Sequence, residues 1–433
     1  MEKLMQYVWQ HRLWLPSDMT TVDGQRVDVL DPGLLNTDAG PDFFNAKIRI
    51  GDRLWAGNVE IHVRASDWHR HGHDHDAAYD TVVLHVVEHD DARICRRDGA
   101  EIPQLVMPCA ADFSKRYHEM VDNPLAEVPC ASQVLTLPKI YVSDWMSALA
   151  FERLYQKSER VLQWVDRFKG DWPQTIYVTL ARALGFGINS DPFERLAAAT
   201  PLRNLMRHRG EGGMVEAMLF GQSTLLDKAL AQYPDDPYVA ALKRDYDFAR
   251  AKYELQPVRD PGWKMARMRP QNFPHRRIAI LSALISGGFE VSYSLLGVNN
   301  ADEARALFDF PLTGYWARRY SFGAPSAARI NALSRSSVDS LIINVVAPVL
   351  HAYGCRTGHN RMTERAVELL QTIPPEDNSI VRLFTSAGID CPDAFTSQAL
   401  VQLRRNYCQA RKCLYCRIGH RFLAQKAIRR RPE

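Results

Sequence analysis

The stretch NTDAGPDFFNAKIRIGDRLWAGNVEIHV, residues 36–63, decides the fold of the first part of this chain. It holds two runs of strand type, 42–50 and 53–64, and the Gly51-Asp52 pair between them is a strong signal for a hairpin turn. Side chains alternate between the two faces of a strand. In the second run one face is therefore apolar, and the other carries an amide, an acid and an imidazole at Asn58, Glu60 and His62.

The register of this hairpin decides whether Asp42 joins the polar face. A two-residue turn places Asp42 opposite Ile61, on the apolar face. A three-residue loop, or a bulge at Gly57, moves Asp42 opposite His62 and diagonal to Glu60, within roughly 5–8 Å. Glycine inside a strand is typical of a bulge. We therefore expect two carboxylates and an imidazole to surround a hard divalent cation, Mg²⁺ or Mn²⁺.

Working outwards, the chain changes character after about residue 129. Helical spacing at 1–15 comes first, and further runs of strand type lie at 21–30, 81–88 and 101–107. Later segments have helical spacing, among them 214–233 and 397–426, and strand-like runs are nearly absent. The fold class is α+β: a mixed sheet flanked by helices, followed by a mostly α-helical region. The expected domains are 1–130, 131–300 and 301–433, the last ending in a basic helix that carries Cys and His residues.

The sequence GPDF at 40–43, a hairpin and then Glu60-x-His62 resembles the signature of the PD-(D/E)xK nuclease superfamily. The resemblance implies a core of one helix, three strands, a helix and a strand. It also implies that Asp42 and Glu60 bind Mg²⁺, and that a third residue, normally Lys, positions or activates the attacking water. His62 stands at that third position, as a base, as a metal ligand or as the mark of a site that has lost activity.

Over nearly its full length the chain also resembles the DUF2851 family of uncharacterised proteins. That likeness rests on the segments GPDFFNAKI, GNVEIHV, DWHRHGH, VVLHVVEH, MRPQNFPHRRIA and CLYCRIGH. It implies no known activity. The nuclease likeness implies metal-dependent hydrolysis of phosphodiester bonds in nucleic acid, with Asp42, Glu60 and His62 as the catalytic residues.

Seven of the fourteen histidines lie between His62 and His89. Imidazole suits transition metals, so His71 and His73 are candidate metal ligands. His85 is either a further ligand or a hydrogen-bonded core histidine within its strand. This density of histidines favours an alternative function, a Zn, Mn or Fe hydrolase that acts on a small phosphate or amide substrate.

Three thiols and an imidazole lie close together near the C-terminus, at Cys408, Cys413, Cys416 and His420. A Cys-x2-Cys pair is a common half-site for zinc, and an iron–sulfur cluster is the other candidate. Some nucleases of the resembled superfamily carry such a cluster with one ligand from far upstream, which implies Cys109 or Cys130 here. Without a metal, the last two cysteines and His420 would share one face of an amphipathic helix.

Basic residues gather in two places. Residues 401–433 hold ten Lys or Arg residues and one acid, and KMARMRPQNFPHRR at 264–277 holds five and none. Such stretches attract a polyanion, unless they are simply a solvated terminal helix and a surface loop. The expected nucleic-acid-binding residues are Lys264, Arg267, Arg269, Arg276, Arg277, Arg404, Arg405, Arg411 and Lys412. A non-catalytic nucleic-acid-binding protein with a degenerate site is the third functional alternative.

The bulk composition predicts an ordinary globular protein. The chain has 433 residues, a net charge of +4 and a hydrophobic share of 46%, so two or three domains are expected. The first residues hold no unbroken apolar stretch, and the longest apolar run, 341–350, contains Asn344 and Pro348. These features predict neither a secretory signal nor a membrane span. We expect a cytoplasmic protein whose eight cysteines are reduced thiols or metal ligands.

Overall fold

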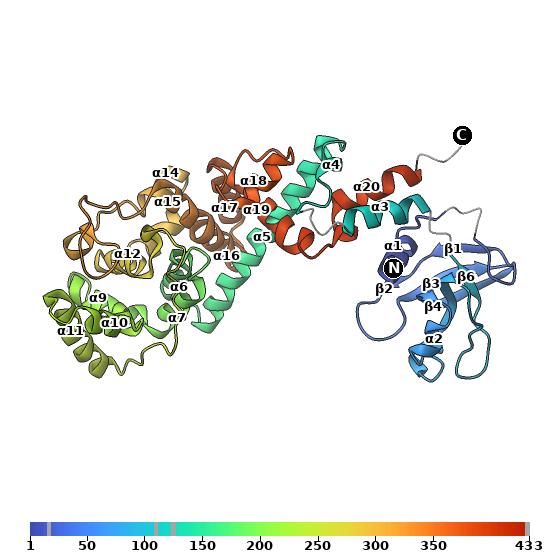
Figure 1. Ribbon diagram of the computed structural model, residues 1–433, viewed down its shortest axis with the longest axis horizontal. Coiled ribbons are helices and arrows are strands. Elements are labelled where there is room, and N and C mark those ends of the chain that lie inside the picture. The colour runs from blue at the N-terminus through green and yellow to red at the C-terminus, as the bar shows by residue number, and fades with distance from the viewer. Residues whose placement is uncertain (15–18, 108–110, 123–126, 429–433) are drawn as a thin grey trace. The chain divides into compact units, whose positions relative to one another are not determined.

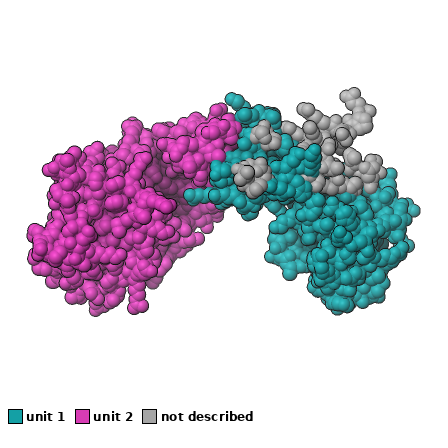
Figure 2. Space-filling view, viewed as in Figure 1, with its two compact units in different colours: residues 1–145, 404–433 teal, residues 146–403 magenta. Residues whose placement is uncertain are grey.

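The computed structural model of the chain describes residues 1–14, 19–107, 111–122 and 127–428. It confirms the α+β class, with a mixed sheet followed by a mostly helical region (Figure 1). Contacts within the chain divide it into two compact units (Figure 2): residues 1–145 with 404–433, and residues 146–403. We call these the sheet unit and the helical unit. The expected domains at 1–130, 131–300 and 301–433 stay a prediction, because contacts do not test which parts fold alone.

The sheet unit is built on a six-stranded sheet in the order β1-β3-β4-β5-β6, with β2 paired to β3. The strands are β1 (Val27–Asp31), β2 (Leu34–Leu35), β3 (Phe43–Ile50), β4 (Arg53–Arg64), β5 (Val82–His89) and β6 (Gln104–Val106). Pairing is antiparallel from β1 to β4 and parallel from β4 to β6. The predicted runs of strand type therefore all contribute a strand, and β4 has the predicted bounds.

Helix α1 (Glu2–Gln10) covers the apolar face of this sheet. Its side chains Leu4, Val8 and Trp9 are buried in one core cluster with Val59 and Ile61 of β4. Apolar residues spaced three and four apart give the helix a single apolar face, and that face is what packs on the sheet. The polar side chains of β4 consequently point to the opposite face.

Further helices complete the sheet unit. They are α2 (Asp67–Arg70), the 3-10 turn η2 (Ala77–Tyr79), α3 (Ala111–Val121), α4 (Ala131–Val134), the first part of α5 (Lys139–Arg167) and α20 (Arg417–Ile428). The C-terminal segment contributes to the same core, because Leu414 and Leu423 are buried in the cluster that contains the sheet. The two ends of the chain therefore build one hydrophobic core.

The helical unit has no strand among residues 146–403, all of which the structure describes. Its helices are α6 (Trp172–Leu184), α7 (Ser190–Ala199), α8 (Leu202–Met206), α9 (Gly212–Gln222), α10 (Leu225–Gln232), α11 (Pro237–Tyr253), α12 (Pro274–Ser286), α13 (Val291–Ser294), α14 (Ala301–Ala306), α15 (Arg335–Leu341), α16 (Ala347–Thr357), α17 (Asn360–Thr372), α18 (Ser379–Ser386) and α19 (Ala394–Gln402). Helix α9 lies at the centre of one cluster and packs on α11 and α12. Gly221 allows this approach, because a Cβ there would lie 2.2 Å from the ring of Tyr246.

By length and apolar composition, the continuous helical stretch Arg335–Thr357 is able to cross a membrane. A bent pair, Pro274–Ser286 with Val291–Gly297, passes the same test as one broken span. In the first stretch 72% of the apolar window is buried inside the protein, which is also what the core helix of a globular domain shows. The expectation that the protein has no membrane span stays a prediction.

Candidate metal centre

A bulge in β3 sets the position of Asp42. The turn at Gly51-Asp52 has two residues, and regular pairing runs from Ile50↔Arg53 to Ala46↔Gly57 before the register shifts to Phe43↔Val59. The extra residue is in β3, where Asn45 has a positive φ of 57°. Asp42 therefore comes beside Glu60, and its backbone N–H donates to Glu60 Oε2 at 3.0 Å.

This register differs from the one expected from a bulge at Gly57. Gly57 pairs regularly with Ala46, and glycine is needed there for another reason. A Cβ at Gly57 would lie 2.4 Å from Val83 Cγ1 and 2.7 Å from the carbonyl oxygen of Thr81. The glycine thus allows the close approach of β5, and Asp42 lies next to Glu60 instead of opposite His62.

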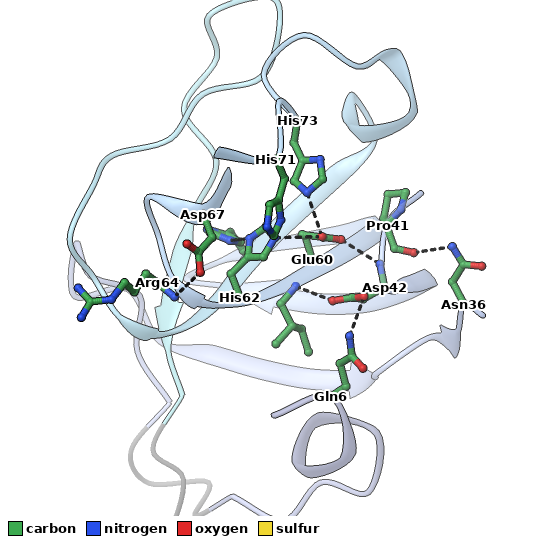
Figure 3. A network of polar contacts seen from close by, with 12 residues as sticks. Gln6, Asn36, Pro41, Asp42, Glu60, His62, Arg64, Asp67, His71 and His73 are labelled. Atoms are coloured by element: carbon green, nitrogen blue, oxygen red, sulfur yellow. Dashed lines mark hydrogen bonds and ion pairs between the residues drawn. The ribbon is translucent and has the colours of Figure 1, made fainter. Parts of the chain in front are cut away.

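The carboxylate of Asp42 is fully engaged by neighbouring donors. Its Oδ1 accepts from Gln6 Nε2 of α1 at 2.8 Å, and its Oδ2 accepts from the Ile61 backbone N–H at 3.0 Å. In Figure 3 this carboxylate lies on the side of Gln6, whereas Glu60 extends towards the histidines. Asp42 therefore stabilises the start of the hairpin beside Glu60. The two carboxylates are not oriented to share the metal ion expected between them.

Two histidines from the segment after β4 reach back over its polar face. Helix α2 is held there by Trp68, which is fully buried, and by Asp67, whose Oδ2 accepts from the Arg64 backbone N–H at 3.3 Å. Gly72 then reverses the chain with a φ of 74°, a conformation that glycine adopts without strain. The reversal brings the side chains of His71 and His73 to Glu60 and His62 (Figure 3).

The nitrogens of His62, His71 and His73 form a group in which one ligand atom from each lies within 4.8 Å of the others. His62 Nε2 lies 3.1 Å from His71 Nδ1. Glu60 Oε1 lies 3.4 Å from both His62 Nε2 and His73 Nε2. The second of these contacts is not aligned as a hydrogen bond, so His73 Nε2 is buried without a hydrogen-bond partner.

These separations match those between ligand atoms that share one metal ion. Two nitrogens bound to zinc at 2.0–2.1 Å in a tetrahedral arrangement lie about 3.3–3.4 Å apart. The observed 3.1 and 3.4 Å fall near this value. A buried nitrogen that lacks a hydrogen-bond partner is also explained if a cation takes its lone pair. The three imidazoles of His62, His71 and His73 therefore fit one metal ion, and the Glu60 carboxylate lies beside two of them.

His85 holds His62 in place and does not face this group. Gln104 Nε2 donates to Asp90 Oδ1 and to the Ala92 carbonyl oxygen, both at 3.0 Å. The amide oxygen of Gln104 is thereby turned towards His85 Nδ1, 3.2 Å away. The Ala92 carbonyl oxygen can only accept a hydrogen bond, so the amide orientation is fixed and His85 carries its proton on Nδ1.

The proton on His85 Nδ1 fixes the tautomer of His62 in turn. A neutral imidazole has one donor and one acceptor nitrogen, so His85 Nε2 accepts from His62 Nδ1, 2.9 Å away. His62 Nε2 is left with its lone pair directed at the ligand group. This outer hydrogen bond is typical of histidines that bind metals. Both nitrogens of His85 are engaged, which corrects its assignment as a metal ligand.

Burial is the main cause of the pKa shifts of Asp42, Glu60, His62 and His85. It raises the pKa of Asp42 and of Glu60, and the neighbouring Glu60 raises that of Asp42 further. It lowers the pKa of His62 to about 2, with a smaller contribution from His85, and it lowers the pKa of His85 to about 4. Neutral histidines are the form that binds a metal, and a cation would offset the cost of a charged Glu60.

The C-terminal cysteines lie in the interior of the sheet unit. Cys408, Cys413 and Cys416 are buried, and Cys413 belongs to the core cluster against which Cys130 packs. His420 Nδ1 contacts the hydroxyl of Tyr7. The assignment of His420 to the cysteine group stays a prediction, and the sequence suggestion of Cys109 lies outside the described residues.

Two of the expected nucleic-acid-binding residues are buried in the helical unit. Arg276 donates to four backbone carbonyl oxygens, those of Trp316, Arg319, Ile330 and Asn331. Arg277 donates to Asn272 Oδ1 at 2.7 Å and lies over the ring of Phe186. Both guanidinium groups stabilise the fold, which corrects their assignment to phosphate binding.

The other expected basic residues remain at or near the surface. Lys264, Arg267 and Arg269 are exposed in the helical unit, and Arg405 and Lys412 are exposed in the sheet unit. Arg411 is half-buried. Arg404 is half-buried too and forms an ion pair with Glu127 at 3.8 Å.

Comparison with known proteins places the chain in one family. No curated protein and no solved structure matches it. The model of a family described as a protein of unknown function, DUF2851, matches residues 2–379. The match includes every strand of the sheet and the four residues of the candidate metal centre, whereas Cys408, Cys413 and Cys416 lie beyond it. The chain therefore belongs to the DUF2851 family.

Proposed function

We propose that this protein is a metal-dependent hydrolase that cleaves phosphodiester bonds in nucleic acid. The observation that carries the proposal is the group of His62, His71 and His73, whose ligand atoms lie within 4.8 Å of one another, with Glu60 Oε1 3.4 Å from two of them. Three imidazoles and one carboxylate favour Zn²⁺, Fe²⁺ or Mn²⁺ over Mg²⁺. Of the two ions expected from the sequence, Mn²⁺ accepts such a donor set more readily.

The residues around this group have distinct parts in the proposed reaction. A bound metal ion would lower the pKa of a water molecule and stabilise charge on the phosphate. His62 and His73 would hold the ion from the buried side, since their side chains are 1% and 10% exposed. His71 is exposed, so the group is open to solvent on its side. Asp42 is a positioning residue, because its backbone N–H fixes one oxygen of Glu60.

Two further features support nucleic acid as the substrate. The order helix, antiparallel strands β1 to β4, short helix and parallel strand β5, with Asp42 before β3 and Glu60 within β4, differs from the arrangement that the nuclease resemblance implies only by the two-residue strand β2. Exposed basic residues are available for phosphate contacts at Lys264, Arg267, Arg269, Arg405 and Lys412.

The histidine-rich donor set also favours a second candidate, a hydrolase acting on a small phosphate or amide substrate. Three imidazoles around one ion are as well suited to a small substrate, because the ion supplies the same activated water in either case. A third candidate, binding of nucleic acid without cleavage, follows from the basic surface alone.

Cleavage assays on the full chain test the proposal. Single- and double-stranded DNA and RNA are incubated with the protein and Mn²⁺, Zn²⁺, Fe²⁺ or Mg²⁺, in wild type and in Glu60→Gln. We expect metal-dependent cleavage by the wild type and a loss of at least about 100-fold in the variant. Glu88→Gln is the matched control, since Glu88 lies half-buried in neighbouring β5.

Each remaining outcome selects another candidate or none. Equal cleavage by wild type and Glu60→Gln rejects the proposed centre. Hydrolysis of a small phosphate ester or amide, lost in His71→Ala and retained in His75→Ala, supports the second candidate; the side chain of His75 is 86% exposed. Salt-sensitive binding of nucleic acid without any turnover supports the third.

A further inference from the structure

A cavity of about 530 Å³ lies within the sheet unit. Its lining comes from the end of α1, from β2, from residues 137–144 around the start of α5, and from residues 414–421, which lead into α20. None of the described residues that line it belongs to the candidate metal centre. Cavities that bind small molecules have volumes of about 300–1,000 Å³. This cavity is therefore large enough to hold a second ligand, separate from any metal ion.

The lining of this cavity is mainly apolar. Leu137, Leu414 and Ile418 line it and are buried, whereas Tyr141 and Tyr415 line it and are exposed. Aliphatic side chains offer no hydrogen bond to a ligand, and a tyrosine ring offers an apolar body with one polar tip. Exposed apolar side chains beside a cavity are typical of a binding site. The lining therefore favours a ligand whose body is a hydrocarbon.

Arg421 brings to the cavity a positive charge that no carboxylate balances among the side chains that the structure describes. Its Nη2 donates to the hydroxyl of Tyr141 at 3.2 Å, and its Cζ lies 4.4 Å from the centre of that ring. The other guanidinium group of the lining, that of Arg417, is instead paired with Asp144 at 2.6 Å. The lining thus has one positive charge in excess, and it belongs to Arg421.

Two imidazoles line the same cavity without adding to this charge. The ring centres of His11 and His420 are 4.9 Å apart, and His420 Nδ1 contacts the hydroxyl of Tyr7. Burial lowers the pKa of both histidines, with further lowering of the His11 pKa by His420 and of the His420 pKa by Arg421. Both rings are therefore neutral near pH 7, and a neutral imidazole still offers a hydrogen bond.

We propose that this cavity binds a monocarboxylate with a hydrocarbon body, such as a medium-chain fatty acid. The planar guanidinium of Arg421 matches the two oxygens of a carboxylate. The aliphatic side chains of Leu137, Leu414 and Ile418 would cover the hydrocarbon and remove it from water. A phosphate monoester carries a charge of about −1.5 to −2 at neutral pH. The single excess charge of the lining therefore fits a carboxylate better than a phosphate group.

Calorimetric titration of the full chain with decanoate tests this inference. We expect one site in each chain, with an affinity about 10–100-fold lower in Arg421→Gln, because hydrogen bonds to a charged group are lost. Decanol has the same hydrocarbon without the charge, so it should bind the wild type and Arg421→Gln equally. Arg53→Gln is the matched control, since Arg53 is exposed in the same unit and does not line the cavity. His62→Ala should bind decanoate as the wild type does, which separates this cavity from the proposed hydrolytic centre.

A series of ligands tests the inference without any substitution. From hexanoate to decanoate the affinity of the wild type should rise about 4-fold for each added methylene group, which is the gain from burying one. Wild-type protein that binds no decanoate, an affinity that does not depend on chain length, or equal binding by the wild type and a folded Arg421→Gln would overturn the inference. Tighter binding of adenosine monophosphate than of decanoate would overturn it as well, because the cavity would then belong to a phosphate ligand.

Discussion

Replacing Gln104 by leucine is expected to weaken metal binding without changing a ligand. Gln104 is 3% exposed and makes three hydrogen bonds, to His85 Nδ1, Asp90 Oδ1 and the Ala92 carbonyl. At about 1 kcal/mol for each bond, the free energy of unfolding should fall by about 3 kcal/mol, partly offset by the apolar side chain. Measured by urea unfolding, this is the effect on stability alone.

The effect on metal affinity follows from the tautomer of His62. Without the amide oxygen, His85 Nδ1–H loses its acceptor and the His85 proton is free to move to Nε2. His62 would then carry its own proton on Nε2, the nitrogen that faces the ligand group. Outer-shell replacements of this kind typically cost 10–100-fold in metal affinity. Calorimetric titration with Zn²⁺ and Mn²⁺ near neutral pH should show a loss of about that size.

The control is Gln25→Leu, since Gln25 is an exposed glutamine of the same unit, and its affinity should equal that of the wild type. A folded Gln104→Leu protein that binds metal as tightly as the wild type would refute the tautomer argument. An affinity unchanged in His62→Ala as well would refute the metal centre itself.

Three other predictions concern charge and packing. Burial raises the pKa of Glu60 from 4.5 to about 8, so ionisation of Glu60 lowers the stability of the metal-free protein as the pH rises through that window. With a chelator present, the melting temperature of Glu60→Gln should therefore fall less between these two pH values than the melting temperature of the wild type. Arg276→Met removes donors to four backbone carbonyls and should lower the free energy of unfolding by about 3–5 kcal/mol in urea unfolding, with no recovery in Arg276→Lys. Gly57→Ala should cost about 1–3 kcal/mol in the same assay, because its Cβ meets Val83 at 2.4 Å. Gly297→Ala, with nothing within 4 Å of its Cβ, should be nearly neutral.

The strands were predictable because their signals are local. Gly51-Asp52 gave the two-residue turn, and alternation along 53–64 gave the two faces of β4. The bulge was not predictable in the same way. Asn45 adopts a left-handed conformation in which its backbone N–H donates to Asn58 Oδ1 of β4, and Gly57 allows a close contact with β5. Both features depend on tertiary contacts, which the rule that a glycine within a strand indicates a bulge does not take into account.

Helix breaks in the later chain were missed for a related reason. The run 214–233 has helical spacing throughout, but the structure breaks it between α9 and α10 at Thr224, which has a φ of 63°. The run 397–426 is likewise interrupted before α20 by the turn that holds Cys413. Periodicity shows where apolar residues recur, and it does not show where the axis turns.

The candidate site was predictable in part. Glu60, His62, His71 and His73 were all expected as metal or catalytic residues, and the structure brings these four together. The role of Gln104 was missed, since it belongs to no motif and acts on His85, which lies 19 residues earlier in the chain. Arg276 and Arg277 were misassigned because the sequence of a basic run next to prolines does not show whether its side chains face solvent or the protein interior.

The first and last segments of the chain share one core, and this has a consequence for synthesis on the ribosome. Residues 1–145 emerge first, yet Leu414 and Leu423, which complete their core, are separated from them by the 258 residues of the helical unit. At 5–20 residues per second, that interval lasts on the order of tens of seconds. During this interval part of the apolar surface of the nascent sheet stays uncovered. A chain whose translation stops early would expose that surface to chaperones and proteases.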